Sequence, residues 1–132
     1  MLQIKKTNEK EKNFFTEMGY YFSRKEIIKE MDCQIYSNDK MNWYIAYIND
    51  EIVGFISVQE FEKYYYIDNF YIVDKYRSLG YGKELFEKVF KDIIFEGKLI
   101  KLITSNEYAK NIFEDFGIIT VGKNGKYYKM QI

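Results

Sequence analysis

The sequence IVDKYRSLGYGK, residues 72–83, decides the fold because it joins a β-rich segment to a helical one through a glycine-containing turn. The first backbone N–H groups of a helix have no partner within the helix, and the helix dipole adds partial positive charge there. Gly80 and Gly82 let an anion approach this backbone without a Cβ in the way. Arg77 and Lys83 add full positive charges. The turn therefore predicts a site for a doubly charged anion such as a pyrophosphate.

Two common nucleotide-binding loops do not match this turn. A Walker-type loop needs Gly-Lys followed by Ser or Thr, and that sequence is absent here. A dinucleotide-binding fingerprint needs a third glycine where this chain has Leu85, and an acid after the next strand, where it has Thr104 and Ser105. A different nucleotide-binding α/β domain that uses the same helix terminus stays an alternative, and a preference for ATP or NAD over CoA would support it.

The segments around the turn alternate between strand and helix patterns. Strand segments are rich in β-branched and aromatic residues, and helical ones place apolar residues on one face. The predicted strands are residues 43–48, 52–58, 64–73, 99–103, 118–121 and 127–132, and the predicted helices after the meander are residues 81–94 and 106–116. Asn49-Asp50 and Asn124-Gly125 are hairpin-turn signals. We therefore predict an α/β fold of the α+β type, with a mixed, mostly antiparallel twisted sheet of six to seven strands flanked by about four helices.

The first third of the chain, residues 1–42, reads as helical. A helix over residues 8–18 would end at Gly19, which suits a helix C-terminus. Ser23 and Glu26 have the spacing of a capping box and predict the start of a second helix. Residues 33–42 resemble a loop, and Cys33 is most simply a small loop or buried residue.

Composition narrows the functional class. The chain has 132 residues, enough for one domain, and its 20 basic and 20 acidic residues cancel. This charge balance argues against a nucleic-acid partner. No apolar run is long enough to predict a membrane span, and the N-terminus lacks the apolar region of a secretory signal, so the expected location is cytoplasmic by default. With no histidine and one cysteine, we predict neither a His-activated nucleophile nor a metal site.

A second motif lies downstream of the turn. Asn106-x-x-Ala109-x-x-x-Phe113, followed by Phe116-Gly117, is similar to the Asn-x-x-Ala-x-x-x-Tyr and Gly-Phe segment of the GNAT superfamily of acyl-CoA-dependent N-acetyltransferases. Arg77-x-x-Gly80-x-Gly82 likewise resembles the acetyl-CoA signature of that family. The resemblance covers roughly residues 43–132. It implies a single GNAT-like domain over residues 1–132, in which residues 1–42 form the variable substrate side and residues 43–132 the acetyl-CoA-binding core.

The resemblance also implies a role for each matching segment. Backbone amides of residues 77–83 would hold the pyrophosphate of acetyl-CoA, and residues 70–73 would separate from residues 99–104 to admit pantetheine. The Ile72 amide would bond the acetyl carbonyl, and Asn106 would contact the pantetheine arm. The implied cofactor-binding residues are Phe70, Ile72, Val73, Arg77, Ser78, Leu79, Gly80, Tyr81, Gly82, Lys83, Asn106 and Phe113.

The proton-transfer groups stay open at this stage. The family often places Tyr where this chain has Phe113, and that phenol protonates the departing thiolate, so Tyr108, Tyr127 or Tyr128 would have to substitute. We place Tyr108 first. Asp68 is the favoured general base because it is the acid closest to the catalytic end of the central strand, and by alternation it shares a face with Tyr66, Phe70 and Ile72. Glu60 and Glu62, at the end of the neighbouring strand, are the alternatives.

Simpler interpretations compete with these roles. The glycine turn could be an ordinary strand-to-helix loop, Asn106 a helix cap, and Asp68 a solvated or salt-bridged strand residue. The leading functional prediction is an N-acetyltransferase that moves an acetyl group from acetyl-CoA to a primary amine of a small molecule or peptide by direct attack. The alternative is a GNAT-like domain that binds acyl-CoA as a sensor or scaffold without efficient chemistry. The predicted terminal strand, residues 127–132, offers an edge through which two copies could form a homodimer.

Overall fold

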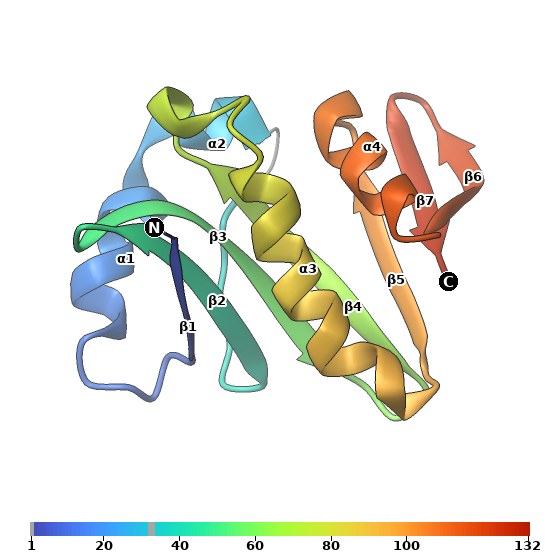
Figure 1. Cartoon of the computed structure of the whole chain (residues 1–132), viewed down its shortest axis with the longest axis horizontal. Coiled ribbons are helices and arrows are strands. Elements are labelled where there is room, and N and C mark those ends of the chain that lie inside the picture. The colour runs from blue at the N-terminus through green and yellow to red at the C-terminus, as the bar shows by residue number, and fades with distance from the viewer. Residues whose placement is uncertain (1, 32–33) are drawn as a thin grey trace.

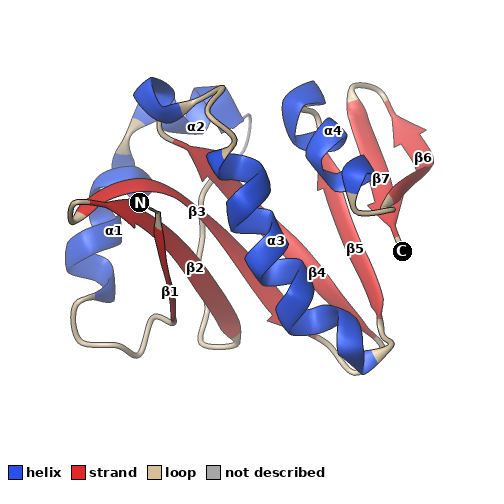
Figure 2. Cartoon of the chain, viewed as in Figure 1, coloured by secondary structure: helices blue, strands red, loops and turns tan. Residues whose placement is uncertain are grey.

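The protein folds as one seven-stranded sheet with helices on both faces, as the computed structural model describes for residues 2–31 and 34–132 (Figures 1 and 2). The strand order across the sheet is β1-β2-β3-β4-β5-β7-β6. The strands are β1 (Gln3–Thr7), β2 (Met41–Ile48), β3 (Glu51–Glu60), β4 (Tyr64–Ile72), β5 (Leu99–Thr104), β6 (Ile119–Asn124) and β7 (Tyr127–Gln131).

The helices lie in two groups. They are α1 (Phe14–Ser23), α2 (Lys25–Met31), α3 (Tyr81–Ile93) and α4 (Glu107–Asp115), with short 3-10 turns η1 (Asp74–Tyr76) and η2 (Ile94–Glu96). One apolar cluster packs α3 and α4 against the sheet and includes Leu85, Phe86 and Phe113. A second cluster packs α1 and α2 against the opposite face and includes Phe14 and Trp43. The sheet therefore divides the molecule into an α3/α4 side and an α1/α2 side.

Every neighbouring strand pair is antiparallel except β4 and β5, which are parallel. Parallel neighbours need a crossover connection, and α3 supplies it by running back across the sheet in Figure 1. The seven strands and four α-helices of the described residues confirm the predicted α+β fold with a mixed, mostly antiparallel sheet. The two hairpin signals also hold, since Asn49, Asp50 and Gly125 all have positive φ angles.

The N-terminal third differs from its helical prediction. Residues 3–7 form β1, which pairs with β2 at the edge of the sheet. Helix α1 begins at Phe14 rather than residue 8 and runs through Gly19 to Ser23. Ser23 does not cap α2, because it is the last residue of α1 and its hydroxyl donates to the Gly19 carbonyl. Cys33 lies outside the described residues.

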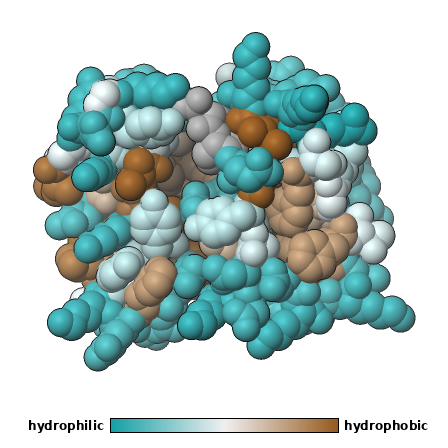
Figure 3. Space-filling model, turned by 180° about the vertical axis from the view of Figure 1, so that it is seen from behind, coloured by the Kyte–Doolittle hydropathy of each residue, from teal (hydrophilic) through white to brown (hydrophobic). Residues whose placement is uncertain are grey.

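The α1/α2 side is mostly hydrophilic at its surface. Figure 3 views the molecule from behind and shows hydrophobic side chains in separate patches among hydrophilic ones. Within residues 2–31 and 34–132, no helix has both the length and the apolar character that a membrane crossing requires.

Candidate functional site

The site begins where β4 and β5 separate. Their last paired residues are Ile67 and Leu102, although β4 continues to Ile72 and β5 to Thr104. Over this second half β4 stays paired with β3, while β5 stays paired with β7. The two strands therefore diverge like the arms of a V, which is visible in Figure 1. This agrees with the separation expected from the sequence, although it begins at residue 68 rather than 70.

A cleft of about 570 Å³ occupies the V, between α2 on one side of the sheet and α4 on the other. This volume lies within the usual range for small-molecule sites. The described residues that line it are Glu30, Met31, Tyr66, Ile67, Asp68, Asn69, Phe70, Tyr71, Ile72, Arg77, Ser78, Leu102, Ile103, Thr104, Ser105, Asn106, Tyr108, Ala109, Phe113 and Tyr127.

A β-bulge in β4 shapes the floor of the cleft. Phe55 pairs with Tyr71 and Ser57 pairs with Asp68, so one residue of β3 faces two residues of β4, Asn69 and Phe70. Asn69 has φ of 52°, in the left-handed region that asparagine tolerates better than most residues. A bulge of this kind re-aims the side chains that follow it.

Asn69 fixes the bulge through hydrogen bonds in a buried setting. Its side chain is 2% exposed, and its amide donates to Ser57 Oγ at 2.8 Å and to the Tyr36 carbonyl at 3.0 Å. The Ser57 hydroxyl in turn donates to the Asp68 carbonyl at 3.1 Å. The Asn69 backbone N–H donates to the Asp68 carboxylate at 2.8 Å. The bulge is thereby tied both to β3 and to the segment that follows α2.

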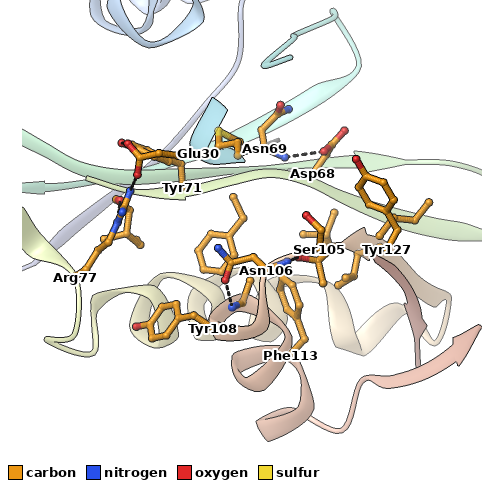
Figure 4. A pocket seen from close by; sticks show the side chains of 18 of the residues that line it. Glu30, Asp68, Asn69, Tyr71, Arg77, Ser105, Asn106, Tyr108, Phe113 and Tyr127 are labelled. Atoms are coloured by element: carbon orange, nitrogen blue, oxygen red, sulfur yellow. Dashed lines mark hydrogen bonds and ion pairs between the residues drawn. The ribbon is translucent and has the colours of Figure 1, made fainter. Parts of the chain in front are cut away.

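The bulge reverses one prediction about Asp68. Ser57, its partner, lies between Ile56 and Val58, which both face the α3/α4 side, so Asp68 faces the α1/α2 side. Phe70 and Ile72 pack in the α3/α4 cluster instead. Asp68 therefore does not share a face with them, because the extra residue shifts the alternation by one. Figure 4 shows Asp68 and Asn69 on one side of β4, with Asn106, Tyr108 and Phe113 on the other.

The backbone of Ile72 points into the gap. The Val73 N–H donates to the Val53 carbonyl at 2.8 Å, so the next pair along, Gly54 and Ile72, is of the non-hydrogen-bonded kind. The N–H and C=O of Ile72 are consequently directed away from β3, toward the side from which β5 has diverged. An N–H directed into a cleft offers a hydrogen bond to an acceptor atom of a bound molecule.

Arg77 braces this end of β4. Its Nε donates to the Ile72 carbonyl at 2.8 Å, and its guanidinium forms ion pairs with Glu30 of α2 at 2.5 Å and Asp74 at 3.3 Å. The guanidinium also lies 5.3 Å from the Tyr71 ring centroid. Arg77 thus connects three segments and is not simply a free positive charge of the turn. Figure 4 shows its ion pair with Glu30.

The two glycines of the turn have different structural roles. Gly80 is the N-cap of α3 and has φ of 86°, a conformation that favours glycine, and no side chain caps the first turn. Gly82 is buried, and a Cβ there would lie 3.1 Å from Ile112 Cδ1 and 3.5 Å from Phe70 Cζ. Gly82 therefore serves close packing between α3, α4 and β4, a role that its sequence position did not reveal. Lys83 forms an exposed ion pair with Asp115.

Helix α4 forms the other wall. Asn106 is its N-cap, and its Oδ1 accepts from the Ala109 N–H at 3.0 Å, so the helix-cap interpretation is correct. Phe113 is 2% exposed and packs 5.7 Å from Phe70 and 4.9 Å from Phe86, centroid to centroid. This ring is an apolar part of the wall and offers no proton.

The three tyrosines considered as proton donors are placed differently. Tyr108 and Tyr127 line the cleft, and Tyr108 is 46% exposed. Tyr128 does not line it, and its hydroxyl donates to Glu107 at 2.7 Å. That hydrogen bond is the largest cause, and burial the second, of a pKa of Tyr128 above its ordinary value.

Some predicted site residues lie beside the cleft rather than in it. Of the predicted set, those outside the lining are Val73, Leu79, Gly80, Tyr81, Gly82 and Lys83. Val73 packs in the α1/α2 cluster, as alternation after Ile72 requires. Among the alternative bases, Glu60 lies near the start of β4, the closed end of the V, where Tyr65 pairs with it and Lys98 forms an ion pair. Glu60 is therefore poorly placed to act in the cleft.

The sequence reasoning missed Glu30, Asn69 and Tyr71. The Tyr71 hydroxyl contacts Glu30. Burial and, after it, the negative charge of Glu30 raise the pKa of Tyr71. One signal for Asn69 was available, since Asp-Asn in the middle of a β-rich run is unfavourable for a regular strand. No group of three or more His, Cys, Asp or Glu residues that could hold a metal ion occurs in the described part of the chain.

A family model matches the chain, whereas a search of curated proteins finds no match. A family model described as an acetyltransferase (GNAT) domain matches residues 5–128. No curated protein matches this sequence.

Several solved structures share the fold. Escherichia coli ElaA is 15% identical, with 99% of both chains covered and a TM-score of 0.78. A GNAT family acetyltransferase from Elizabethkingia anophelis, solved with acetyl-CoA bound, is 13% identical, with 99% of this chain and 97% of that chain covered and a TM-score of 0.69. The PaiA N-acetyltransferase from Thermoplasma acidophilum, solved with coenzyme A, is 12% identical, with 99% and 98% covered and a TM-score of 0.68.

Proposed function

Because the chain belongs to the GNAT acetyltransferase family, we propose that it transfers an acetyl group from acetyl-CoA to a primary amine of a small molecule or peptide. The observation that carries this proposal is the V between β4 and β5, with the inward-directed amide of Ile72 at its floor. The uncapped N-terminus of α3 follows the same strand and suits a pyrophosphate. The proposed site thus offers an anion site, a channel and a hydrogen-bond donor in succession.

In this proposal the Ile72 N–H bonds the acetyl carbonyl of acetyl-CoA. Its direction is fixed by the β3 pairing and by the Arg77 hydrogen bond to the Ile72 carbonyl. A pre-aligned N–H stabilises the negative charge that develops on the carbonyl oxygen during attack. The amine nitrogen forms a bond to the acetyl carbon, the carbon–sulfur bond breaks, and no covalent link to the protein forms.

Asp68 is the proposed general base. An alkylamine with a pKa near about 10.4 is almost fully protonated at neutral pH, so a group must accept its proton before attack. Asp68 lines the cleft from the α1/α2 side, while Phe70 and Ile72 line it from the α3/α4 side. An amine that enters from the α1/α2 side would therefore meet Asp68, directly or through water, before it reached the acetyl group.

Tyr108 is the proposed acid. It lies in the first turn of α4, lines the cleft and would give its phenolic proton to the departing thiolate. Loss of a positioned acid or base costs roughly a hundredfold in rate. We expect Tyr108→Phe and Asp68→Asn each to lower kcat by about this factor with little change in acetyl-CoA affinity. Tyr127→Phe is the matched control, because Tyr127 lines the cleft from β7. A loss of kcat in Tyr127→Phe with none in Tyr108→Phe would transfer the acid role to Tyr127.

The test of the proposal combines binding with turnover. Acetyl-CoA or CoA at about a hundred times Kd should stabilise the protein by roughly 2.7 kcal/mol, which raises Tm by several degrees, whereas ATP and NAD should not. Acetyl transfer is then measured with a panel of amines, by the release of the free thiol of CoA. Stabilisation by CoA species without transfer to any amine would favour the sensor or scaffold alternative. No stabilisation by either CoA species would overturn the proposal.

A further inference from the structure

The Ile72 carbonyl has its hydrogen-bond partner in a side chain rather than in a strand. In the closed half of β4, the backbone groups directed away from β3 bond to β5, but β5 has diverged before Ile72. A carbonyl that is shielded from water needs another donor when its strand partner is lost. Ile72 is 7% exposed, and Arg77 Nε donates to its carbonyl at 2.8 Å. Arg77 therefore takes the place that a neighbouring strand would have had.

The Arg77 guanidinium is held through all three of its nitrogen atoms. Its Nε contacts β4, while Nη1 forms an ion pair with Asp74 at 3.3 Å and Nη2 forms one with Glu30 at 2.5 Å. A guanidinium is a rigid planar fork, so these three contacts together set its orientation. The Tyr71 ring, whose centroid lies 5.3 Å from Arg77 Cζ, bounds one face of the fork.

The two carboxylates on Arg77 come from different parts of the fold. Asp74 lies three residues before Arg77 in the same turn, and its side chain is 87% exposed. Glu30 belongs to α2, and both of its oxygens face the end of β4: Oε2 meets Arg77, and Oε1 accepts from the Tyr71 hydroxyl at 3.5 Å. Figure 4 shows Glu30, Tyr71 and Arg77 gathered at one end of the cleft. Glu30 is thus the partner that anchors Arg77 to a separate element.

The position of this ion pair makes it more important for geometry than for stability. The two side chains are 37% and 40% exposed, and ion pairs at such positions contribute little to the stability of a fold. A donor to a reacting carbonyl, by contrast, must lie within about 0.5 Å of its productive position. Loss of the pair should therefore change the rate of acetyl transfer more than it changes Tm.

We infer that Glu30 is a positioning residue for acetyl transfer, an assignment that rests on the proposed function. Glu30 holds Arg77 against the Ile72 carbonyl, and Arg77 in turn limits the rotation of Ile72. The N–H and C=O of one strand residue point to the same side, so a tether on this carbonyl also restrains the N–H that is the proposed donor to the acetyl group. Glu30 accepts no proton in this role and acts on the reaction only through Arg77.

Two substitutions of Glu30 separate positioning from two other roles open to a carboxylate in the cleft. Glu30→Ala removes both oxygens, whereas Glu30→Gln keeps an oxygen that can accept from Arg77 but cannot serve as a base. We expect kcat to fall about tenfold in Glu30→Ala and about threefold or less in Glu30→Gln, with KM for the amine and Kd for acetyl-CoA within about twofold of the parent. Equal losses in the two variants would indicate a base, and a raised KM for the amine would indicate a substrate ligand. Either result would overturn the inference.

Glu51→Ala is the matched control. Glu51 of β3 forms a comparable ion pair with Lys75 at 2.6 Å, its side chain is 52% exposed, and it does not line the cleft. We expect its kcat to stay within about twofold of the parent, and Tm to fall by no more than a few degrees in either alanine variant. An equal fall of kcat in Glu51→Ala and Glu30→Ala would mean that general loosening of this end of the sheet is the cause, and would overturn the assignment.

A double-mutant cycle measures the dependence on Arg77. Arg77→Lys keeps the positive charge but lacks Nε and the planar fork. In this background Glu30→Ala should change kcat by less than about twofold, because the tether is already lost. A further tenfold loss would show that Glu30 acts independently of Arg77 and would overturn the inference.

A measurement without substrates distinguishes failure of this inference from failure of the proposed function. In the backbone amide NMR spectrum of the unliganded protein, we expect the Ile72 resonance to shift in Glu30→Ala and to stay in place in Glu51→Ala. An unmoved Ile72 resonance in Glu30→Ala would overturn the inference, whatever the activity. A shifted resonance together with no acetyl transfer by the parent protein to any amine would support the tether and count against the proposed function.

Discussion

The two halves of β4 have different structural roles. Residues 65–67 pair with β3 on one side and β5 on the other, whereas Asp68, Tyr71 and Ile72 pair with β3 alone. The first half holds the sheet together, with Tyr65 and Ile67 in the α3/α4 cluster. The second half directs a backbone N–H into the cleft. A strand becomes a binding surface here when it loses a neighbour and the freed backbone is held in place by other contacts.

Those contacts come from opposite sides of the sheet. Asn69 fixes the start of the open half through Ser57 and Tyr36. Gly82 allows α3 to pack close to Phe70 on the other face. The closed half needs no such support, because two ladders of hydrogen bonds hold it. This difference predicts that equivalent changes should affect the open half more strongly.

The largest expected effect follows removal of the Asn69 clamp. Asn69→Ala should lower the free energy of unfolding by about 3 kcal/mol, because buried partners lose hydrogen bonds and alanine disfavours a φ of 52°. Chemical denaturation measures the loss, and kcat should fall with it because the open half is no longer fixed.

Asn69→Gly separates the two causes. Glycine accepts the left-handed conformation but cannot make the side-chain hydrogen bonds, so this variant should recover about 1 kcal/mol relative to Asn69→Ala and stay catalytically impaired. Restored activity in Asn69→Gly would show that the conformation alone matters and that the clamp does not.

Overpacking at Gly82 should have the next largest effect. Gly82→Val places branched carbons against Ile112, Ile72 and Phe70 and should cost about 2 kcal/mol, with a Tm loss of several degrees and weaker acetyl-CoA binding. Gly19→Ala is the control, because that helical glycine has open space around it and alanine should stabilise the helix by about 0.5–1 kcal/mol. If Gly82→Val melts like the parent protein, the close approach of α3 is not needed.

A smaller effect is expected from the charge at the start of α3. Lys83→Gln should raise the Kd for acetyl-CoA about fivefold, because one ammonium near a phosphate contributes roughly 1 kcal/mol in a solvated setting. The effect should shrink at high salt. Lys91→Gln removes a comparably exposed, ion-paired lysine from the last turn of the same helix, and calorimetry should find its Kd unchanged. Equal Kd values for the two variants would remove Lys83 from the anion site.

The smallest effect should come from the closed end. The hydrogen bond from Lys98 holds the pKa of Glu60 below its ordinary value. A lowered folded-state pKa stabilises the protein at neutral pH, and that stabilisation disappears as the pH falls through the folded-state value. Glu60→Gln should therefore lower Tm by about a degree or two at neutral pH, with the two curves converging in acid. A Tm difference that persists in acid would mean that the ion pair is not its source.

Much of the α3/α4 side was predictable from sequence. Local patterns placed the strand before residue 74, the helix after Gly80 and the Asn106 cap, because each depends on residues close together in the chain. The same patterns predicted the sheet, whereas the separation of residues 70–73 from residues 99–104 was implied by the family resemblance.

The α1/α2 side was decided by tertiary structure. Strand β1 forms because the edge of β2 pairs with it, and neither the helix-like composition of residues 1–42 nor their spacing reveals that partner. The direction of Asp68 could not be read from alternation, because a single extra residue at the bulge reverses it. The Glu30–Arg77 pair joins residues 47 positions apart (77 minus 30). Sequence alone determined the elements after residue 43 and the glycine turn that precedes α3, since these depend on short-range propensity. Which side chains meet in the cleft depends on long-range packing and strand register, and only the folded chain decides those.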